Sequence, residues 1–172
     1  MLAKLSNETD LAGFRAEGRV LLAQQIPPEQ VQWQTAGAVN NDLFAEIDAT
    51  LIAQSPVPKA SVPASFLTLC ETVVLHSDPK RFALLYRLLW RLVHEPALRH
   101  DPIDADMLAA QAMAQSVRRD MHKMKAFVRF RQVQEDGRPE PLHVAWFEPD
   151  HHITEAVAPW FARRFAQMRW AI

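Results

Sequence analysis

The hydrophobic pattern of this sequence changes its period at residue 126. Between 81 and 123 apolar side chains recur every three or four residues, as on the buried face of a helix. From residue 126 onwards apolar and polar residues alternate, and Arg129 and Arg131 stand between apolar neighbours. Asp136-Gly137 then marks a turn, and the apolar run 142–147 returns as the second strand of a hairpin. Helices joined to an antiparallel hairpin predict an α+β fold, with several helices packed on a small antiparallel sheet.

Cap residues and prolines bound the remaining predicted elements. Asn7 or Thr9 is the expected N-cap of the first helix, Asp104 is an expected start of a long third helix, and Asp150 is the expected cap of the last helix. The final strand is expected to lack a partner. The expected helices are Leu11–Leu22, Ser65–His76, the segment after Pro79 to His94, 101 or 104 to Lys123, and 150–165; the expected strands include Val31–Gln34 and Met168–Ile172.

The chain of 172 residues is expected to form a single domain, 1–172, because its length suffices for one hydrophobic core. Its least regular part is 35–64, which holds Asn40-Asn41 and three prolines. This composition predicts a connection, interrupted by one short apolar segment at Leu43–Ile52.

Composition excludes several classes of protein. Cys70 is the sole cysteine, so a disulfide within the chain or a site of several thiolates is excluded, and its apolar surroundings predict a buried, inert thiol. Four glycines in the whole chain leave no dinucleotide fingerprint or phosphate loop. No apolar run reaches the length of a membrane span. We expect a cytoplasmic protein with no cofactor, no metal site and no membrane association.

Charge is distributed unevenly along the chain, although the formal net charge is −1. Residues 80–131 carry eleven Lys and Arg against five Asp and Glu, a net charge of +6. Their densest part, 116–131, spans the end of a predicted helix and the start of a strand. Arginine and lysine one turn apart can project together toward phosphate oxygens. The alternative is a solvated charged surface. The predicted nucleic-acid-binding residues are Arg118, Arg119, His122, Lys123, Lys125, Arg129, Arg131, Arg87 and Arg91.

A second group of polar residues follows the hairpin. Glu148, His151 and His152 lie close together in sequence, and His122 is a candidate neighbour. Imidazole and carboxylate side chains can act as general acid and base. Adjacent histidines on a helix point about 100° apart, which disfavours a shared metal ion. These four residues are the candidate catalytic residues; the alternative for His151 or His152 is a structural hydrogen bond.

Most aromatic residues, Trp146 included, are interpreted as packing residues because of their spacing. Tyr86 and Trp90 are the exception, because they lie one turn apart beside Arg87 and Arg91.

Three segments of the chain together resemble a bacterial DNA metabolism protein family. They are FALLYRLLWR at 82–91, VRRDMHKMKAFVRF at 117–130 and AWFEPDHHI at 145–153. The family is a domain of unknown function, found alone or fused N-terminal to a uracil-DNA glycosylase-like domain. The resemblance runs from about Asp10 to Ile172 and is weakest across 35–64.

The resemblance implies an α+β domain with a role in DNA repair or DNA metabolism, and it transfers no established catalytic residue. It also implies that the chain can be the N-terminal part of a longer fusion protein. DNA, a uracil-DNA glycosylase-like domain and a radical-SAM protein are the expected partners. The first hypothesis is an accessory domain that binds nucleic-acid phosphates. The alternatives are a hydrolase or base-modifying enzyme that uses the His/Glu cluster, and a protein-interaction module.

Overall fold

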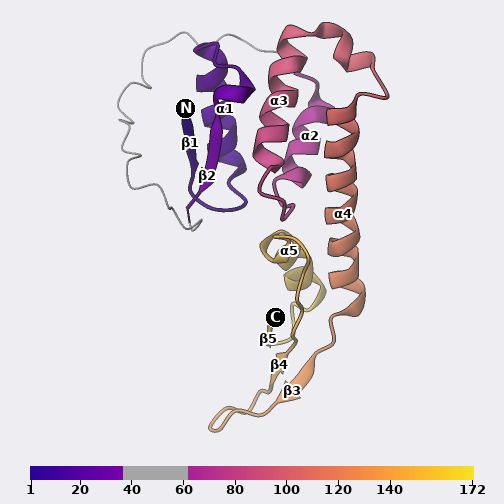
Figure 1. The fold of residues 1–172 in the computed structure, drawn as a ribbon. Coiled ribbons are helices and arrows are strands. Elements are labelled where there is room, and N and C mark those ends of the chain that lie inside the picture. The colour runs from indigo at the N-terminus through magenta and orange to yellow at the C-terminus, as the bar shows by residue number, and fades with distance from the viewer. Residues whose placement is uncertain (37–61) are drawn as a thin grey trace.

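The computed structural model describes residues 1–36 and 62–172 (Figure 1). The expected segment Leu43–Ile52 and most of the expected connection 35–64 lie outside these residues. The elements in chain order are β1 (Leu2–Leu5), α1 (Leu11–Ala23), β2 (Gln32–Thr35), α2 (Ala64–Val73), α3 (Arg81–His94), α4 (Ala105–Phe127), β3 (Arg131–Val133), β4 (Leu142–Val144), α5 (Thr154–Arg164) and β5 (Trp170–Ala171).

The N-terminal sheet consists of β1 and β2, which pair in parallel with α1 as the connection between them. In β1 Ala3 and Leu5 are buried while Lys4 is exposed, so the strand has one face against the core. β2 confirms the extended piece expected near Val31–Gln34, whereas β1 has no counterpart among the expected elements. The first helix starts one residue after Asp10, whose carboxylate accepts a 2.7 Å hydrogen bond from the backbone of Gly13. The expected caps, Asn7 and Thr9, are therefore wrong.

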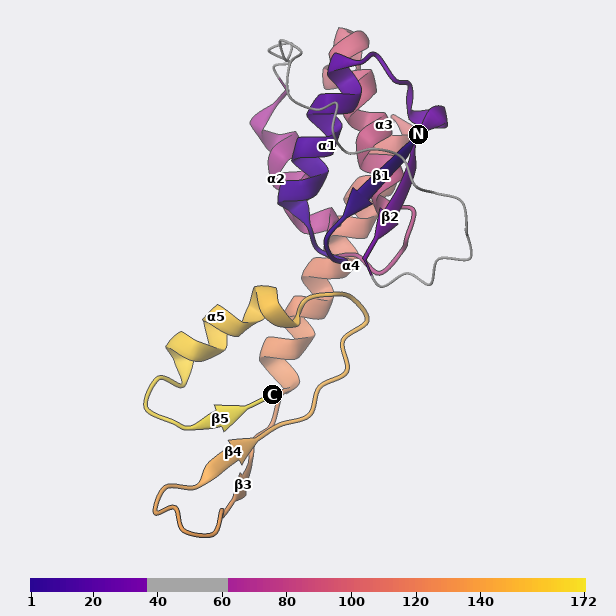
Figure 2. The same cartoon turned by 90° about the vertical axis from the view of Figure 1, so that its left-hand side faces the viewer.

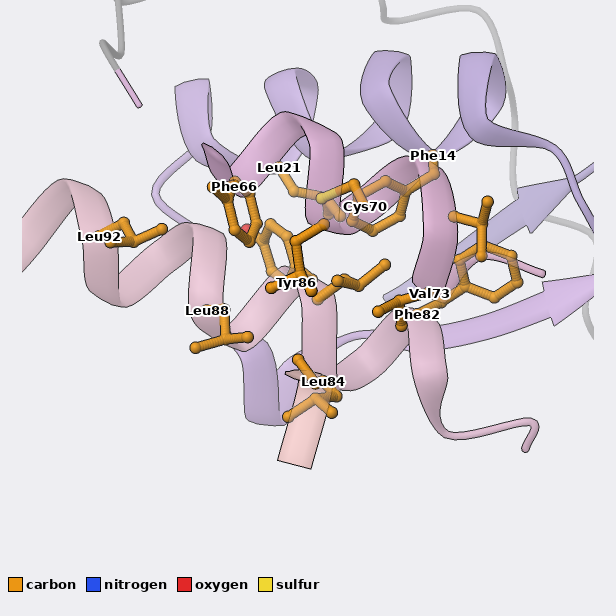
Figure 3. Close-up of a cluster of buried hydrophobic side chains, with 14 of the residues drawn as sticks. Phe14, Leu21, Phe66, Cys70, Val73, Phe82, Leu84, Tyr86, Leu88 and Leu92 are labelled. Carbon is orange, nitrogen blue, oxygen red and sulfur yellow. The ribbon is translucent and has the colours of Figure 1, made fainter. Parts of the chain in front are cut away.

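The first hydrophobic core lies among α1, α2 and α3 (Figure 3). Helix α3 buries a stripe that includes Phe82, Leu85 and Leu88, as its spacing predicts. Tyr86 is also fully buried, and its hydroxyl donates a 2.7 Å hydrogen bond to the carbonyl of Ile26. The ring of Tyr86 is therefore a packing group, and it is not available to stack on a base beside Trp90.

Helix α4 joins the two halves of the structure (Figure 1). Asp104 is its N-cap, as expected, and accepts a 2.9 Å hydrogen bond from the backbone of Met107. Ala110 and Ala114 pack into the first core, and Val117 and Met124 pack into a second one. The helix continues to Phe127, four residues beyond the expected end at Lys123. One continuous helix thus carries the predicted basic segment from the first core to the C-terminal sheet.

The C-terminal sheet has the order β3–β4–β5, and α5 lies against it (Figure 2). β3 and β4 form the expected antiparallel hairpin, and Gly137 supplies the positive φ of its turn. The expectation that the last strand lacks a partner is wrong, because β5 pairs in parallel with β4. Asp150 does not cap α5, which has no side-chain cap; it contacts Lys123 instead.

Helices and small sheets together confirm the expected α+β class. Within the described ranges no helix combines the length and the apolar character that crossing a membrane requires.

Candidate nucleic-acid interface

The last three turns of α4 present basic side chains on the side that faces away from the core. Successive residues of a helix point about 100° apart. We express the direction of each side chain as its rotation about the α4 axis from the buried Val117. Lys125 and Arg118 project at about 80° and about 100°, and Arg119 and Lys123 at about 200° and about 240°. Lys125 is half-buried, and the other three are exposed. One broad outer surface therefore holds all the cations of this segment of α4.

Several of these side chains lack an anionic partner. Arg118, Arg119 and His122 make no ion pair with any residue of the described ranges. Lys123 lies 3.4 Å from Asp150, but both groups are exposed and the pair is weak. Lys125 lies 5.8 Å from the ring centroid of Trp160, a contact that leaves its charge uncompensated.

Two further cations follow on the way into β3. The Nη1 atom of Arg129 donates hydrogen bonds to the carbonyls of Ala126 and Val128, at 2.8 and 3.0 Å, where α4 ends. Arg131 is exposed, lies opposite Val144 in the hairpin and has no ion pair within the described ranges. We call the following seven side chains the cationic face: Arg118, Arg119, His122, Lys123, Lys125, Arg129 and Arg131.

Arg87 and Arg91 lie elsewhere and are neutralised. Arg87 donates to both carboxylate oxygens of Asp106, at 2.7 and 3.0 Å. Arg91 lies 2.8 Å from Asp104 and 3.0 Å from Asp106, and it also pairs with Glu95. These contacts fasten α3 to the first turn of α4. The hydrogen bonds that both guanidinium groups donate to these carboxylates raise their pKa values. Asp106 lies about 18 Å from Arg118 along the axis of α4. Arg87 and Arg91, which bind Asp106, are therefore separated from the cationic face.

His151 lies inside the molecule and joins three segments. Its backbone N–H donates to Asp120 Oδ2 at 3.0 Å, and its Nε2 lies 2.8 Å from Ser116 Oγ. On the other side of the ring, the backbone N–H of Ser77 donates to Nδ1 at 3.2 Å. The ring also packs on that of His76, with centroids 4.2 Å apart. His151 thereby connects α4 to the turn that precedes α3.

The hydrogen bonds determine which ring nitrogen of His151 is the acceptor. Because the N–H of Ser77 can only donate, Nδ1 must carry a lone pair, and Nε2 of the neutral ring bears the proton. Nε2 therefore donates to Ser116, whose hydroxyl accepts. The ring in this state does not activate Ser116 as a nucleophile, since a general base would accept the hydroxyl proton. The arrangement favours the structural alternative for His151.

The other candidate catalytic residues have different surroundings. His152 faces Glu8 of the N-terminal segment, with Nε2 4.0 Å from Oε2. His122 stands two residues after Asp120 on α4, and so projects about 200° away from the side chain that binds His151. Glu148 is exposed and makes no ion pair within the described ranges. The structure does not gather His122, Glu148, His151 and His152 around one point, and within those ranges no group of three His, Cys, Asp or Glu could hold a metal ion.

Two groups of site residues escaped the sequence interpretation. Ser77, Ser116 and Asp120 become partners of His151 only through folding, and no local pattern marks them. Trp146 was interpreted as a packing residue, but it is 88 % exposed. Ala145, Trp146 and Phe147 are all apolar, so no alternation in the sequence marks the exposed residue among them.

The C-terminal half of the chain matches a known family. The model described as "Domain of unknown function (DUF4130)" matches residues 79–172, more than half of the chain, and the chain belongs to this family. The matched residues begin just before α3 and include the cationic face and His151. No curated protein and no solved structure matches the chain.

Proposed function

We propose that this chain is an accessory domain of DNA repair or DNA metabolism that binds nucleic-acid phosphates through the cationic face. The observation that carries the proposal is the exposed group of cations on α4 and β3 without strong carboxylate partners. Backbone phosphates attract such a surface whatever the base sequence, and binding releases counterions. The DNA-related role, and a partner of the uracil-DNA glycosylase or radical-SAM type, rest on the resemblance of the three segments described above.

The contrast with the other arginines of the chain supports this choice. Arg81 is buried against Glu8, and Arg87 and Arg91 are bound by carboxylates at the start of α4. Arginines whose charge is already compensated within the fold attract little further anion. Arg118, Arg119 and Arg131 are exposed and have no such ion pair in the described part of the chain, so they remain available to an external anion.

The hydrolase alternative receives less support from the geometry. It requires His122, Glu148, His151 and His152 to surround one substrate atom within hydrogen-bond reach. His151 is instead occupied by Ser77 and Ser116, and His122 projects from another side of α4. The protein-interaction alternative predicts no binding to DNA at low salt, and the following experiment separates it from our proposal.

The test compares two triple charge reversals of the full chain by fluorescence anisotropy with labelled DNA. Arg118→Glu, Arg119→Glu and Arg131→Glu together should weaken binding at least about tenfold. The matched control is Lys4→Glu, Arg15→Glu and Arg19→Glu, which changes the net charge equally on exposed residues of the N-terminal region. The proposal predicts a much smaller loss for the control. Equal losses in both variants would show that overall charge acts rather than the cationic face.

A further inference from the structure

The C-terminal sheet has one covered face and one open face. On the covered face Phe130 packs on Phe165, the residue that follows α5, with ring centroids 5.2 Å apart, and Trp170 packs on Phe161 of α5 at 6.2 Å. Successive strand residues point to opposite sides of a sheet, so Arg131 and its partner Val144 point away from α5.

The open face is apolar at its centre and aromatic at one end. Val133 is 44 % exposed, Val144 is 37 % exposed and Trp146 is 88 % exposed. Ala145 donates a backbone hydrogen bond to Ala171, so the pairing continues to Ala145. Trp146 stands between Ala145 and Phe147, which both pack into the second core, and so projects to the other side with Val144. No described element packs over this indole. An exposed apolar patch with polar residues at its border is typical of a surface that contacts a ligand or partner.

Cations border the same face. Arg131 stands opposite Val144, and Arg129 precedes it by two residues and therefore shares its side. Both are members of the cationic face, so the open sheet continues the surface of α4. A π surface beside guanidinium groups is the combination that binds single-stranded nucleic acid, in which bases stack on aromatic rings and phosphates contact cations.

We infer that the open face of β3, β4 and β5 binds single-stranded nucleic acid, with an unpaired base stacked on Trp146 and the adjoining phosphates near Arg129 and Arg131. This inference rests on the proposed function and specifies its substrate class. A duplex offers its phosphates but keeps the faces of its internal bases stacked. A second copy of the chain related by a twofold axis would bring like-charged arginines together on this face, which disfavours a dimer.

The test is an anisotropy titration of the full chain with a labelled oligothymidine and with a duplex of equal length. Trp146→Ala should weaken binding of the single strand on the order of tenfold, since loss of one stacked base has this effect. It should leave the duplex affinity and the salt dependence of binding nearly unchanged. Trp146→Phe should restore most of the affinity, because phenylalanine also offers a ring. Ile103→Ala, which removes another exposed apolar side chain, is the control and should change neither affinity.

The outcomes distinguish this inference from the proposed function. If the unmodified chain binds DNA and Trp146→Ala binds the single strand equally well, the inference is wrong and the cationic face alone accounts for binding. If Trp146→Ala instead dissociates a dimer without changing DNA affinity, the open face is a contact between copies and the inference is likewise wrong. If the unmodified chain binds neither oligonucleotide at low salt, the proposed function fails together with the inference.

Discussion

Arg81 Nη2 lies 2.6 Å from Glu8 Oε2, although the two residues are 73 positions apart in the sequence. The Arg81 side chain is 1 % exposed and Glu8 is 41 % exposed. The same guanidinium donates to the carbonyls of Val74, Asp78 and Glu8. Arg81 thus ties the start of α3 to the end of α2 and to the segment before α1.

Removing this guanidinium should destabilise the fold strongly. Arg81→Ala leaves buried carbonyls without donors and opens a cavity, and we expect a loss of about 3 kcal/mol in the free energy of unfolding. Glu8→Gln keeps the size of the partner and the backbone contacts, and should cost only about 1 kcal/mol. Urea denaturation measures both values. Equal, small losses would contradict a central role for Arg81.

Acidification should destabilise the protein below the ordinary pKa of histidine. Burial lowers the pKa of His76 and of His152 below the usual 6.5, and the positive charge of Arg81 lowers both pKa values further. The unfolded chain therefore binds protons first as the pH falls, and stability decreases from about pH 6.5 until the folded histidines also titrate.

Glu8 should add a second loss at lower pH. Burial alone would raise its pKa, but hydrogen bonds from Thr35 and Arg81 and the charge of Arg81 together lower it below the usual 4.5. Its stabilisation is present above pH 4.5 and disappears as the pH falls through the folded pKa. Urea midpoints measured from about pH 8 to about pH 3 cover both steps. His152→Gln should reduce the first step, and a midpoint that stays constant down to about pH 5 would contradict it.

Cys70 should resist thiol reagents in the folded protein. It is 3 % exposed, and burial raises its pKa to about 12, so almost no thiolate is present at neutral pH. We expect labelling by an aromatic disulfide reagent only after denaturant unfolds the chain. The control is the same reaction in denaturant, which should modify one thiol per chain. Rapid labelling without denaturant would show that the core around Cys70 opens readily.

Elements governed by local pattern could be predicted from the sequence. The spacing of apolar residues predicts the buried stripe of α3, the cap at Asp104 predicts where α4 starts, and the turn at Gly137 predicts the hairpin. Distant pairings could not be predicted in this way. β1 pairs with β2 across α1 and was not predicted as a strand. A strand at Met168–Ile172 was predicted, but its pairing with β4 across α5 was not, because that contact is formed only by folding.

The site shows the same division between local and distant information. The density of basic residues predicts the cationic face, because charge on an exposed helix surface is visible in sequence. The charges of Arg87 and Arg91 look equally available there, yet folding brings Asp104 and Asp106 against them. Ser116 becomes the partner of His151 through a contact that spans 35 residues. Tertiary contacts decide which charged and polar groups remain free to bind a ligand.

The salt dependence of DNA binding by the unmodified chain tests the central proposal most directly. Anisotropy titrations with single-stranded and duplex DNA would be compared at about 50 mM and about 200 mM salt. The cationic face predicts that the chain binds DNA at low salt and that the affinity falls on the order of tenfold or more over this range. The affinity falls because binding releases counterions from several phosphates, and added salt opposes that release. No binding at low salt, or an affinity that does not change with salt, would contradict the proposal that these cations contact a nucleic-acid backbone.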